Sequence, residues 1–285
     1  MPLRAVGRGA GYSFPRAVQE AVLRRAYAGG WPARLWGRVP GALEVACRHG
    51  TLAVLPPGAA PLRLGFASDL HIGPTTPPAL LDRAADLLAA ADLDVLLLGG
   101  DYVFLEATDA TAATLATFAR RIPARHKLAV LGNHDLWTWH GRLERALESA
   151  GVSLLTNRAI RIGDVAVFGL DDPWTGAPDA DAALAACGDA SVRIGLVHSP
   201  DGMPLVWDRG VAALFCGHTH GGQVALPGGR PIIVPGPAGK VWPWGRHEVG
   251  GTSLFVSRGL GGVEVPFRAN AEPDVWVVDV TSVGG

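Results

Sequence analysis

The sequence predicts an α/β fold, and three features indicate it. Apolar runs typical of buried strands occur at 62–68, 94–98 and 127–131, and each is followed by polar residues. Segments with apolar side chains at helical spacing separate these runs, at 79–91 and 109–121. The run 94–98 is almost continuously apolar, which is typical of a parallel strand covered by helices on both faces. Strand, polar residues and helix therefore repeat in the pattern of βαβ units.

The first 60 residues differ from the rest because they are rich in Arg, Gly and Pro. We expect an N-terminal basic and amphipathic segment at 1–60 and one large domain at 61–285. Residues 16–38 mix arginines with apolar side chains, and two interpretations stay open. The segment could lie on an anionic membrane surface, or it could be a helix packed on the domain with its arginines in solvent. The glycines and proline at 29–32 break it into short pieces, which favours the packed helix.

The remaining elements are predicted from alternation and β-branched content. The alternation in 42–56 predicts a hairpin leading into the core. A second sheet is expected from short strands after residue 151 and from three strands near the C-terminus, namely 152–155, 159–162, 165–170, 232–234, 253–256 and 275–280. Between these groups, a helix at 179–186 precedes strands at 192–197 and 211–216, and histidines follow both strands.

Charge and hydropathy exclude several classes of protein. The formal charge is −1, from 25 basic and 26 acidic residues, so we expect no dedicated nucleic-acid partner. No apolar run approaches the roughly 18 residues that span a bilayer, and the N-terminus lacks the apolar core of a secretory signal. We therefore expect a cytoplasmic location, with peripheral contact at the inner face of the membrane if residues 16–38 bind lipid.

Five strand ends carry residues that bind metals or transfer protons. These residues are Asp69, His71, Asp101, Asn133, His134, Asp135, His198, His218 and His220. A single Asp or His after a strand is usually a turn former or a helix cap. Five of the nine histidines, however, follow apolar strands, and clustering them without a cation would leave buried polar groups unpaired at about 1 to 3 kcal/mol each. A metal site removes that cost.

The number of candidate ligands predicts two divalent ions. Nitrogen and oxygen donors without thiolate suit manganese, iron or zinc, and we expect manganese. If Asp101 bridges, each ion receives four protein ligands and keeps a position for water. Two ions about 3.5 to 4 Å apart can share a hydroxide and hold a phosphoryl group for its in-line attack. The predicted chemistry is hydrolysis of a phosphate ester.

Five sequence blocks resemble, in order, the signatures of the calcineurin-like metallophosphoesterases. They are Asp69-Leu70-His71, Gly100-Asp101, Gly132-Asn133-His134-Asp135, His198 and Gly217-His218-Thr219-His220. The resemblance implies two packed mixed β-sheets flanked by helices, a four-layer αββα sandwich. It also implies that one ion is held by Asp69, His71, Asp101 and His220, and the other by Asp101, Asn133, His198 and His218. His134 would stabilise the transition state or protonate the leaving oxygen, and Asp135 would orient it.

Longer matches are similar to the bacterial YkuE/YaeI-type phosphodiesterase branch. They are Ser68-Asp69-Leu70-His71-Ile72-Gly73, Gly217 to Val224 and Ser257-Arg258-Gly259-Leu260-Gly261. This branch is related to UDP-2,3-diacylglucosamine pyrophosphohydrolases of lipid A synthesis, so that activity is a specific alternative within phosphodiester or pyrophosphate cleavage. Branch members often carry a membrane segment or export signal, which this sequence does not show.

Several residues outside the predicted ligand set are weaker candidates for substrate contact. Arg258 could bind a phosphate through its guanidinium, or it could be an ordinary surface arginine. Gln223 follows two glycines that let the backbone approach the metal site. Five tryptophans in loops could wall a cleft or simply pack, namely Trp137, Trp139, Trp174, Trp242 and Trp244.

Two functions remain to be compared. The complete ligand set favours a two-metal phosphohydrolase acting on a phosphodiester or pyrophosphate. A non-catalytic scaffold with the same fold is the alternative, and metal analysis of the purified protein separates the two.

Overall fold

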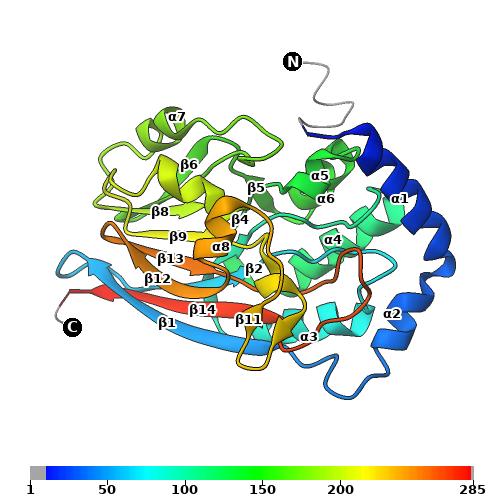
Figure 1. The fold of residues 1–285 in the computed structure, drawn as a ribbon. Helices are drawn as coiled ribbons and strands as arrows, with labels where there is room; N and C mark the ends of the chain where they lie inside the picture. Colours follow the sequence, from blue (N-terminus) through cyan, green and yellow to red (C-terminus); the bar gives the residue numbers. More distant parts are fainter. Residues whose placement is uncertain (1–10, 284–285) are drawn as a thin grey trace.

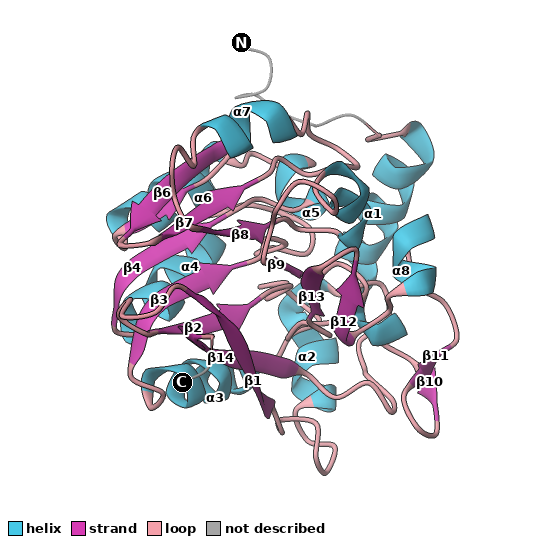
Figure 2. Ribbon diagram, turned by 90° about the vertical axis from the view of Figure 1, so that its left-hand side faces the viewer, coloured by secondary structure: helices cyan, strands magenta, loops and turns pink. Residues whose placement is uncertain are grey.

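Two six-stranded mixed β-sheets pack face to face and organise the chain (Figures 1 and 2). The computed structural model describes residues 11–283, so 1–10 of the predicted N-terminal segment and 284–285 lie outside the described part. The first sheet has the order β1 (Ala46–Leu55), β14 (Asp274–Ser282), β2 (Leu62–Ala67), β3 (Leu93–Leu98), β4 (Ala124–Ala129) and β5 (Val152–Leu154). The second has the order β12 (Gly245–Val249), β13 (Thr252–Val256), β9 (Ala213–Cys216), β8 (Val192–Leu196), β7 (Val165–Gly169) and β6 (Arg158–Ile162).

Helices cover the outer faces of both sheets and complete the predicted four-layer αββα sandwich (Figure 1). The first sheet is covered by α3 (Pro78–Ala89), α4 (Asp109–Arg121) and α6 (Gly141–Ser149), and the second by α7 (Ala180–Ala185) and the 3₁₀ segment η2 (Pro200–Leu205). Shorter elements are α5 (Asn133–Leu136), α8 (Pro237–Val241), the 3₁₀ turns η1 (Ala28–Gly30) and η3 (His220–Gly222), and the two-stranded β10 (Ala225–Leu226) with β11 (Arg230–Pro231). The fold class predicted from the sequence is confirmed.

Strand β3 shows why its sequence is almost continuously apolar. Val95 and Leu97 point into the core between the two sheets, whereas Leu96 and Leu98 point into the core under the helices. Successive side chains of a strand face opposite sides, so a strand buried on both faces needs apolar residues at every position. Strands β2, β3 and β4 run parallel, which brings their carboxyl ends to one edge.

The predicted arrangement of the strands was wrong in four places. Strand β14, predicted in the second sheet, lies in the first, antiparallel to β2. Strand β5 likewise pairs in parallel with β4 of the first sheet. The hairpin predicted at 42–56 is the single strand β1, which pairs with β14, so these residues belong to the first sheet. Residues 232–234 are not a strand.

The N-terminal helices α1 (Phe14–Ala26) and α2 (Trp31–Trp36) pack against the domain (Figure 1). In α2, Pro32, Ala33 and Trp36 are buried, and the Ala33 backbone N–H donates to the Pro74 carbonyl oxygen at 2.9 Å. Helix α2 is therefore packed on the domain, and membrane contact through residues 16–38 stays a prediction. Within residues 11–283, no helix has both the length and the hydropathy needed to cross a membrane.

Candidate metal centre

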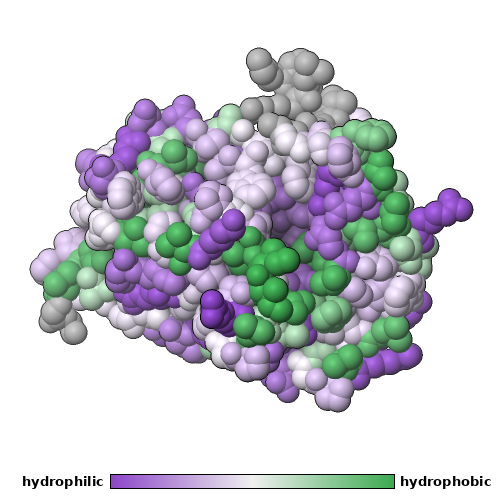
Figure 3. All heavy atoms as spheres, viewed as in Figure 1, coloured by the Kyte–Doolittle hydropathy of each residue, from purple (hydrophilic) through white to green (hydrophobic). Residues whose placement is uncertain are grey.

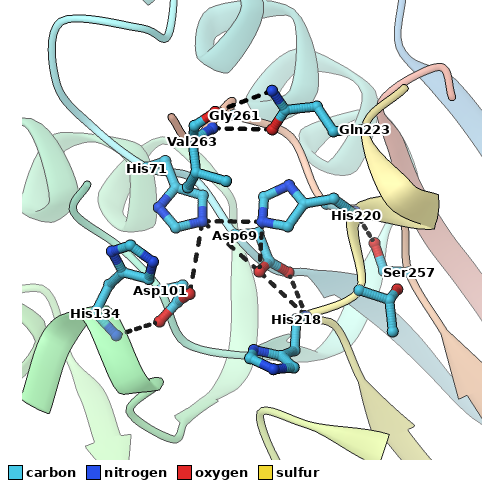
Figure 4. A network of polar contacts seen from close by, with 12 residues as sticks. Asp69, His71, Asp101, His134, His218, His220, Gln223, Ser257, Gly261 and Val263 are labelled. Carbon is cyan, nitrogen blue, oxygen red and sulfur yellow. Dashed lines mark hydrogen bonds and ion pairs between the residues drawn. The ribbon is translucent and has the colours of Figure 1, made fainter. Parts of the chain in front are cut away.

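The predicted ligands lie together at the carboxyl ends of strands from both sheets. Asp69 and His71 follow β2, Asp101 follows β3 and Asn133 begins α5 just after β4. His198 follows β8, and His218 and His220 follow β9. All seven side chains are buried. Because β2, β3 and β4 are parallel, as are β8 and β9, residues up to 151 positions apart meet at one place (Figure 4).

Backbone strain is concentrated at this place. Positive φ angles, which L-residues other than Gly rarely adopt, occur at 53° for Asp69, 42° for His71, 55° for Asp101, 70° for His218 and 53° for His220. Such conformations persist only where the surroundings enforce them, and they cluster at functional sites. The strain therefore supports a functional role for the three loops that hold these five residues.

Two groups of side chains have the geometry of metal-ligand clusters. Asp69, His71 and His220 form one, and Asp101, His198 and His218 form the other, with the ligand atoms of each group within 4.8 Å of one another. Asp101 lies between the groups, because its Oδ2 is 3.6 Å from His71 Nε2 and 3.2 Å from His198 Nε2. This position fits the predicted bridging role.

Backbone carbonyls fix the orientation of two histidines. His198 Nδ1 lies 2.8 Å from the Gly99 carbonyl oxygen, and His71 Nδ1 lies 3.4 Å from that of Val103. A carbonyl only accepts, so each Nδ1 carries a hydrogen and Nε2 is the atom of each ring left to bind a metal ion. Both Nε2 atoms are directed at the Asp101 carboxylate, and against the opposing effect of burial the negative charge of Asp101 raises the pKa of His198.

The unpaired atoms of the site fit divalent cations. Within residues 11–283, Asn133 Oδ1 and His218 Nε2 are buried without a hydrogen-bond partner. Burial raises the pKa of Asp69, and burial, followed by His198, lowers the pKa of His218 to about 3. Buried carboxylates beside neutral imidazoles are costly unless a cation is held among them. The residues present therefore suit the two ions that the donor set predicts.

His134 and Asp135 lie beside the candidate ligands but take different roles. The His134 backbone N–H donates to Asp101 Oδ1 at 2.9 Å. The Asp135 carboxylate accepts from the backbone N–H groups of Tyr102 at 2.8 Å and Gly132 at 3.0 Å. Within the described chain, no hydrogen bond joins the Asp135 carboxylate to the His134 ring. Asp135 therefore holds the loops after β3 and β4, whereas the resemblance implied that it orients the imidazole.

A cleft of about 620 Å³ opens over the candidate metal centre. Its floor includes Asp101, Asn133 and His134, and one wall is apolar. Figure 3 shows the hollow, with a band of hydrophobic surface along its lower edge. The apolar lining residues are Trp137, Trp174, Val224, Ile232, Ile233, Pro235, Val263 and Val265. The structure thus places two of the five candidate tryptophans, Trp137 and Trp174, in the wall.

Arg258 lies outside this cleft, and the side-chain amide of Gln223, which borders it, bonds to the backbone. The Arg258 guanidinium lies 3.7 Å from the Trp244 ring centroid and 3.3 Å from Glu272, and it lines a separate cavity. The Gln223 side chain lines the cleft, but its amide groups bond to the backbone of Val263, Val265 and Phe267, as Figure 4 shows for Val263. Gln223 therefore anchors the loop that borders the cleft.

Sequence reasoning missed two arginines at the site. Arg268, which is partly buried, lies 3.0 Å from His220 Nδ1 and donates to the Gly261 carbonyl oxygen at 2.6 Å. Arg16 of α1 lines the cleft and lies 3.4 Å from His134. Neither residue belongs to a sequence pattern that marks a site, so no local signal could have found them.

The two-sheet sandwich and the paired ligand clusters define the class of two-metal phosphoesterases. Residues 62–222 match the Calcineurin-like phosphoesterase family, and the chain belongs to that family.

Two bacterial relatives support the expected branch. The chain is 36% identical over 162 residues to the uncharacterized metallophosphoesterase YkuE of Bacillus subtilis, a match that covers 55% of this chain and only 56% of YkuE. It is 31% identical over 256 residues to the phosphodiesterase YaeI of Escherichia coli, covering 85% of this chain and 89% of YaeI. Among solved structures, TT1561 of Thermus thermophilus has a TM-score of 0.44 at 12% identity over 70% of this chain and 91% of that chain. The family assignment does not depend on that structure.

Proposed function

We propose that this protein is a two-metal-dependent phosphohydrolase that cleaves a phosphodiester or pyrophosphate bond. The observation that carries the proposal is the pair of ligand clusters on either side of Asp101, at the floor of an open cleft. One ion would be held by Asp69, His71, Asp101 and His220, and the other by Asp101, Asn133, His198 and His218. Two such ions supply Lewis acidity toward phosphoryl oxygens and an activated water near neutral pH.

The residues around the ions would orient the substrate and move protons. His134 lies beside the first cluster, with its ring centroid 4.9 Å from that of His71. A histidine at this distance can protonate the departing oxygen once a substrate is seated, because its ring borders the cleft. The Trp137 ring packs 5.1 Å from the His134 ring and limits its movement.

The test is hydrolysis of bis-(p-nitrophenyl) phosphate with added Mn²⁺. We expect Asp101→Ala and His218→Ala to abolish turnover, whereas His49→Ala, an exposed histidine on β1, keeps it. Turnover in the first two variants equal to that of His49→Ala would contradict the proposal. Fewer than one transition metal ion per chain after Mn²⁺ supplementation would instead favour the scaffold alternative.

The apolar wall favours a more specific substrate, a lipid-linked pyrophosphate such as UDP-2,3-diacylglucosamine. Phosphate and metal ions need no apolar wall, so the wall fits a substrate with an acyl or other apolar group. Membrane contact through residues 16–38 would suit the same substrate. In α1, Phe14, Val18 and Val22 are 82%, 46% and 60% exposed at i, i+4 spacing. Cleavage of this nucleotide lipid faster than cyclic nucleotides or phosphoproteins supports this assignment, and the reverse order contradicts it.

A further inference from the structure

We propose that Arg16 is a substrate-binding residue whose guanidinium contacts the phosphoryl oxygens of the substrate. The inference rests on the proposed function and adds a residue from α1, which lies outside the matched residues 62–222. Helix α1 runs along one edge of the domain (Figure 1), and Arg16 contacts the ring of Trp137, just after α5. Arg16 lines the same cleft as Asp101, Asn133 and His134.

Two carboxylates and an indole hold the guanidinium in place. Arg16 Nε donates to Glu20 Oε1 at 3.1 Å, and Nη1 donates to Glu264 Oε1 at 2.9 Å. The guanidinium carbon lies 4.6 Å from the centroid of the Trp137 ring, a cation–π contact. The side chain is only 13% exposed. A side chain fixed on three sides loses little further conformational entropy when it binds a ligand.

The Nη2 atom of the Arg16 guanidinium, which lies beside His134, still has hydrogens that it can donate to a ligand. Nη2 lies 3.4 Å from His134 Nδ1, but that nitrogen is 2.9 Å from the Phe104 carbonyl oxygen. The Phe104 carbonyl can only accept, so His134 Nδ1 carries a hydrogen and cannot also accept from Arg16. Across residues 11–283, no other acceptor lies within hydrogen-bond distance of Nη2. The Nη2 hydrogens are therefore available to a ligand in the cleft.

The chemistry of the ligand follows from these donors. A guanidinium fixed through Nε and Nη1 presents its Nη2 hydrogens in a defined direction, and phosphoryl oxygens are strong, charged acceptors. The two glutamates lie on the Nε and Nη1 side, so they orient the group without occupying the Nη2 edge. Arg16 Nη2 also lies beside His134, so a phosphoryl group bound there would be close to the proposed proton donor.

The experiment compares Arg16→Gln and Arg16→Lys with Arg25→Gln, an exposed arginine on the same helix, in metal-loaded full-length protein. Binding of inorganic phosphate is measured by calorimetry, and KM and kcat are measured with bis-(p-nitrophenyl) phosphate. We expect Arg16→Gln to weaken phosphate binding about 10- to 100-fold and to raise KM, because a charge-assisted hydrogen bond is lost. Arg16→Lys should lie in between, Arg25→Gln should match the wild type, and metal content should stay constant.

The proposal is overturned if Arg16→Gln binds phosphate as tightly as Arg25→Gln does. This holds even if kcat falls, because a fall in kcat alone would mean that Arg16 only positions other residues. If Arg16→Gln unfolds, Arg16→Lys decides in its place, because it keeps the charge beside Glu20 and Glu264. Wild-type phosphate affinity in that variant also overturns the proposal. A wild-type protein that binds metal but cleaves no phosphodiester or pyrophosphate contradicts the proposed function instead, whatever the variants do.

Discussion

The Nδ1 atom of His134 lies 2.9 Å from the carbonyl oxygen of Phe104. This contact fixes the hydrogen on Nδ1 and leaves Nε2 as the atom that can exchange a proton with a substrate. The His134 backbone N–H meanwhile donates to Asp101 Oδ1, the candidate bridging ligand. The proposed acid and the proposed bridge are thereby held at a fixed separation.

His134→Asn should lower kcat by about 10²- to 10⁴-fold with little change in metal content, because proton transfer contributes rate enhancement of that size. The loss should be smaller for a p-nitrophenolate leaving group than for an alkoxide, which needs a proton more. Steady-state kinetics with both kinds of ester and metal analysis check this. A parallel fall in metal content, or equal losses for the two leaving groups, would contradict the role as acid.

Gly132→Ala should destabilise the protein by about 1 to 3 kcal/mol and reduce metal binding, because overpacking displaces neighbouring atoms. The added Cβ would lie 2.2 Å from Asp101 Oδ1 and 2.6 Å from the Asp101 backbone nitrogen. Gly141→Ala in α6 is the matched control, since its Cβ would be no closer than 3.6 Å to Arg145 Nη1. Urea unfolding and metal titration of both variants measure the effect. Similar results for the two would show that Gly132 is not needed to seat Asp101.

Asp172→Asn should make stability less dependent on pH. Asp172 is inaccessible to solvent, and its Oδ2 accepts from the backbone N–H groups of Trp174 and Thr175 at 3.1 and 2.7 Å. Burial raises the pKa of Asp172 to about 6, above an unfolded value of about 3.9. The Asp172 carboxyl therefore binds its proton more tightly in the folded protein than in the unfolded chain. This contribution to the free energy of unfolding is complete below about pH 4 and is lost as the pH rises through about 6.

Asparagine does not titrate and can accept the same two hydrogen bonds. The variant should therefore gain up to about 3 kcal/mol relative to the wild type between pH 4 and 7. Urea unfolding in EDTA, which removes the contribution of metal binding, measures the difference. A stability difference that stays constant over this pH range would contradict the raised pKa.

Ile233→Ser should lower kcat/KM about 10-fold for a substrate with an acyl chain and leave a small diester unaffected. Ile233 borders the cleft and is 77% exposed, so its apolar surface is free to be covered by a ligand. Leu205→Ser, at an exposed position outside the cleft, serves as the control. Equal losses on both substrates would show that the apolar wall does not select the substrate.

The clustering of the candidate ligands could be predicted from the sequence because its signals are local. Each ligand follows an apolar run typical of a buried strand. Strands β2, β3, β8 and β9 lie close to their predicted positions, whereas β4 spans Ala124–Ala129 and the prediction was 127–131. Parallel strands then bring their ends together without further information. The predicted clustering of seven residues needed only these local patterns and the resemblance in five blocks.

Long-range pairing was the part that the sequence could not predict. The β-branched run of β14 would suit either sheet, and only its pairing with β1 and β2 assigns it to the first. The placement of Arg16 has the same cause, because it meets His134 across 118 residues. An arginine on an amphipathic helix has the same sequence pattern whether it faces solvent or a cleft.

The most direct test of the two-cluster site is an anomalous difference map from crystals grown with Mn²⁺. We expect two peaks about 3.5 to 4 Å apart, one beside each ligand cluster, with the Asp101 carboxylate contacting both. A single peak, no peak, or two peaks that do not share Asp101 would contradict it.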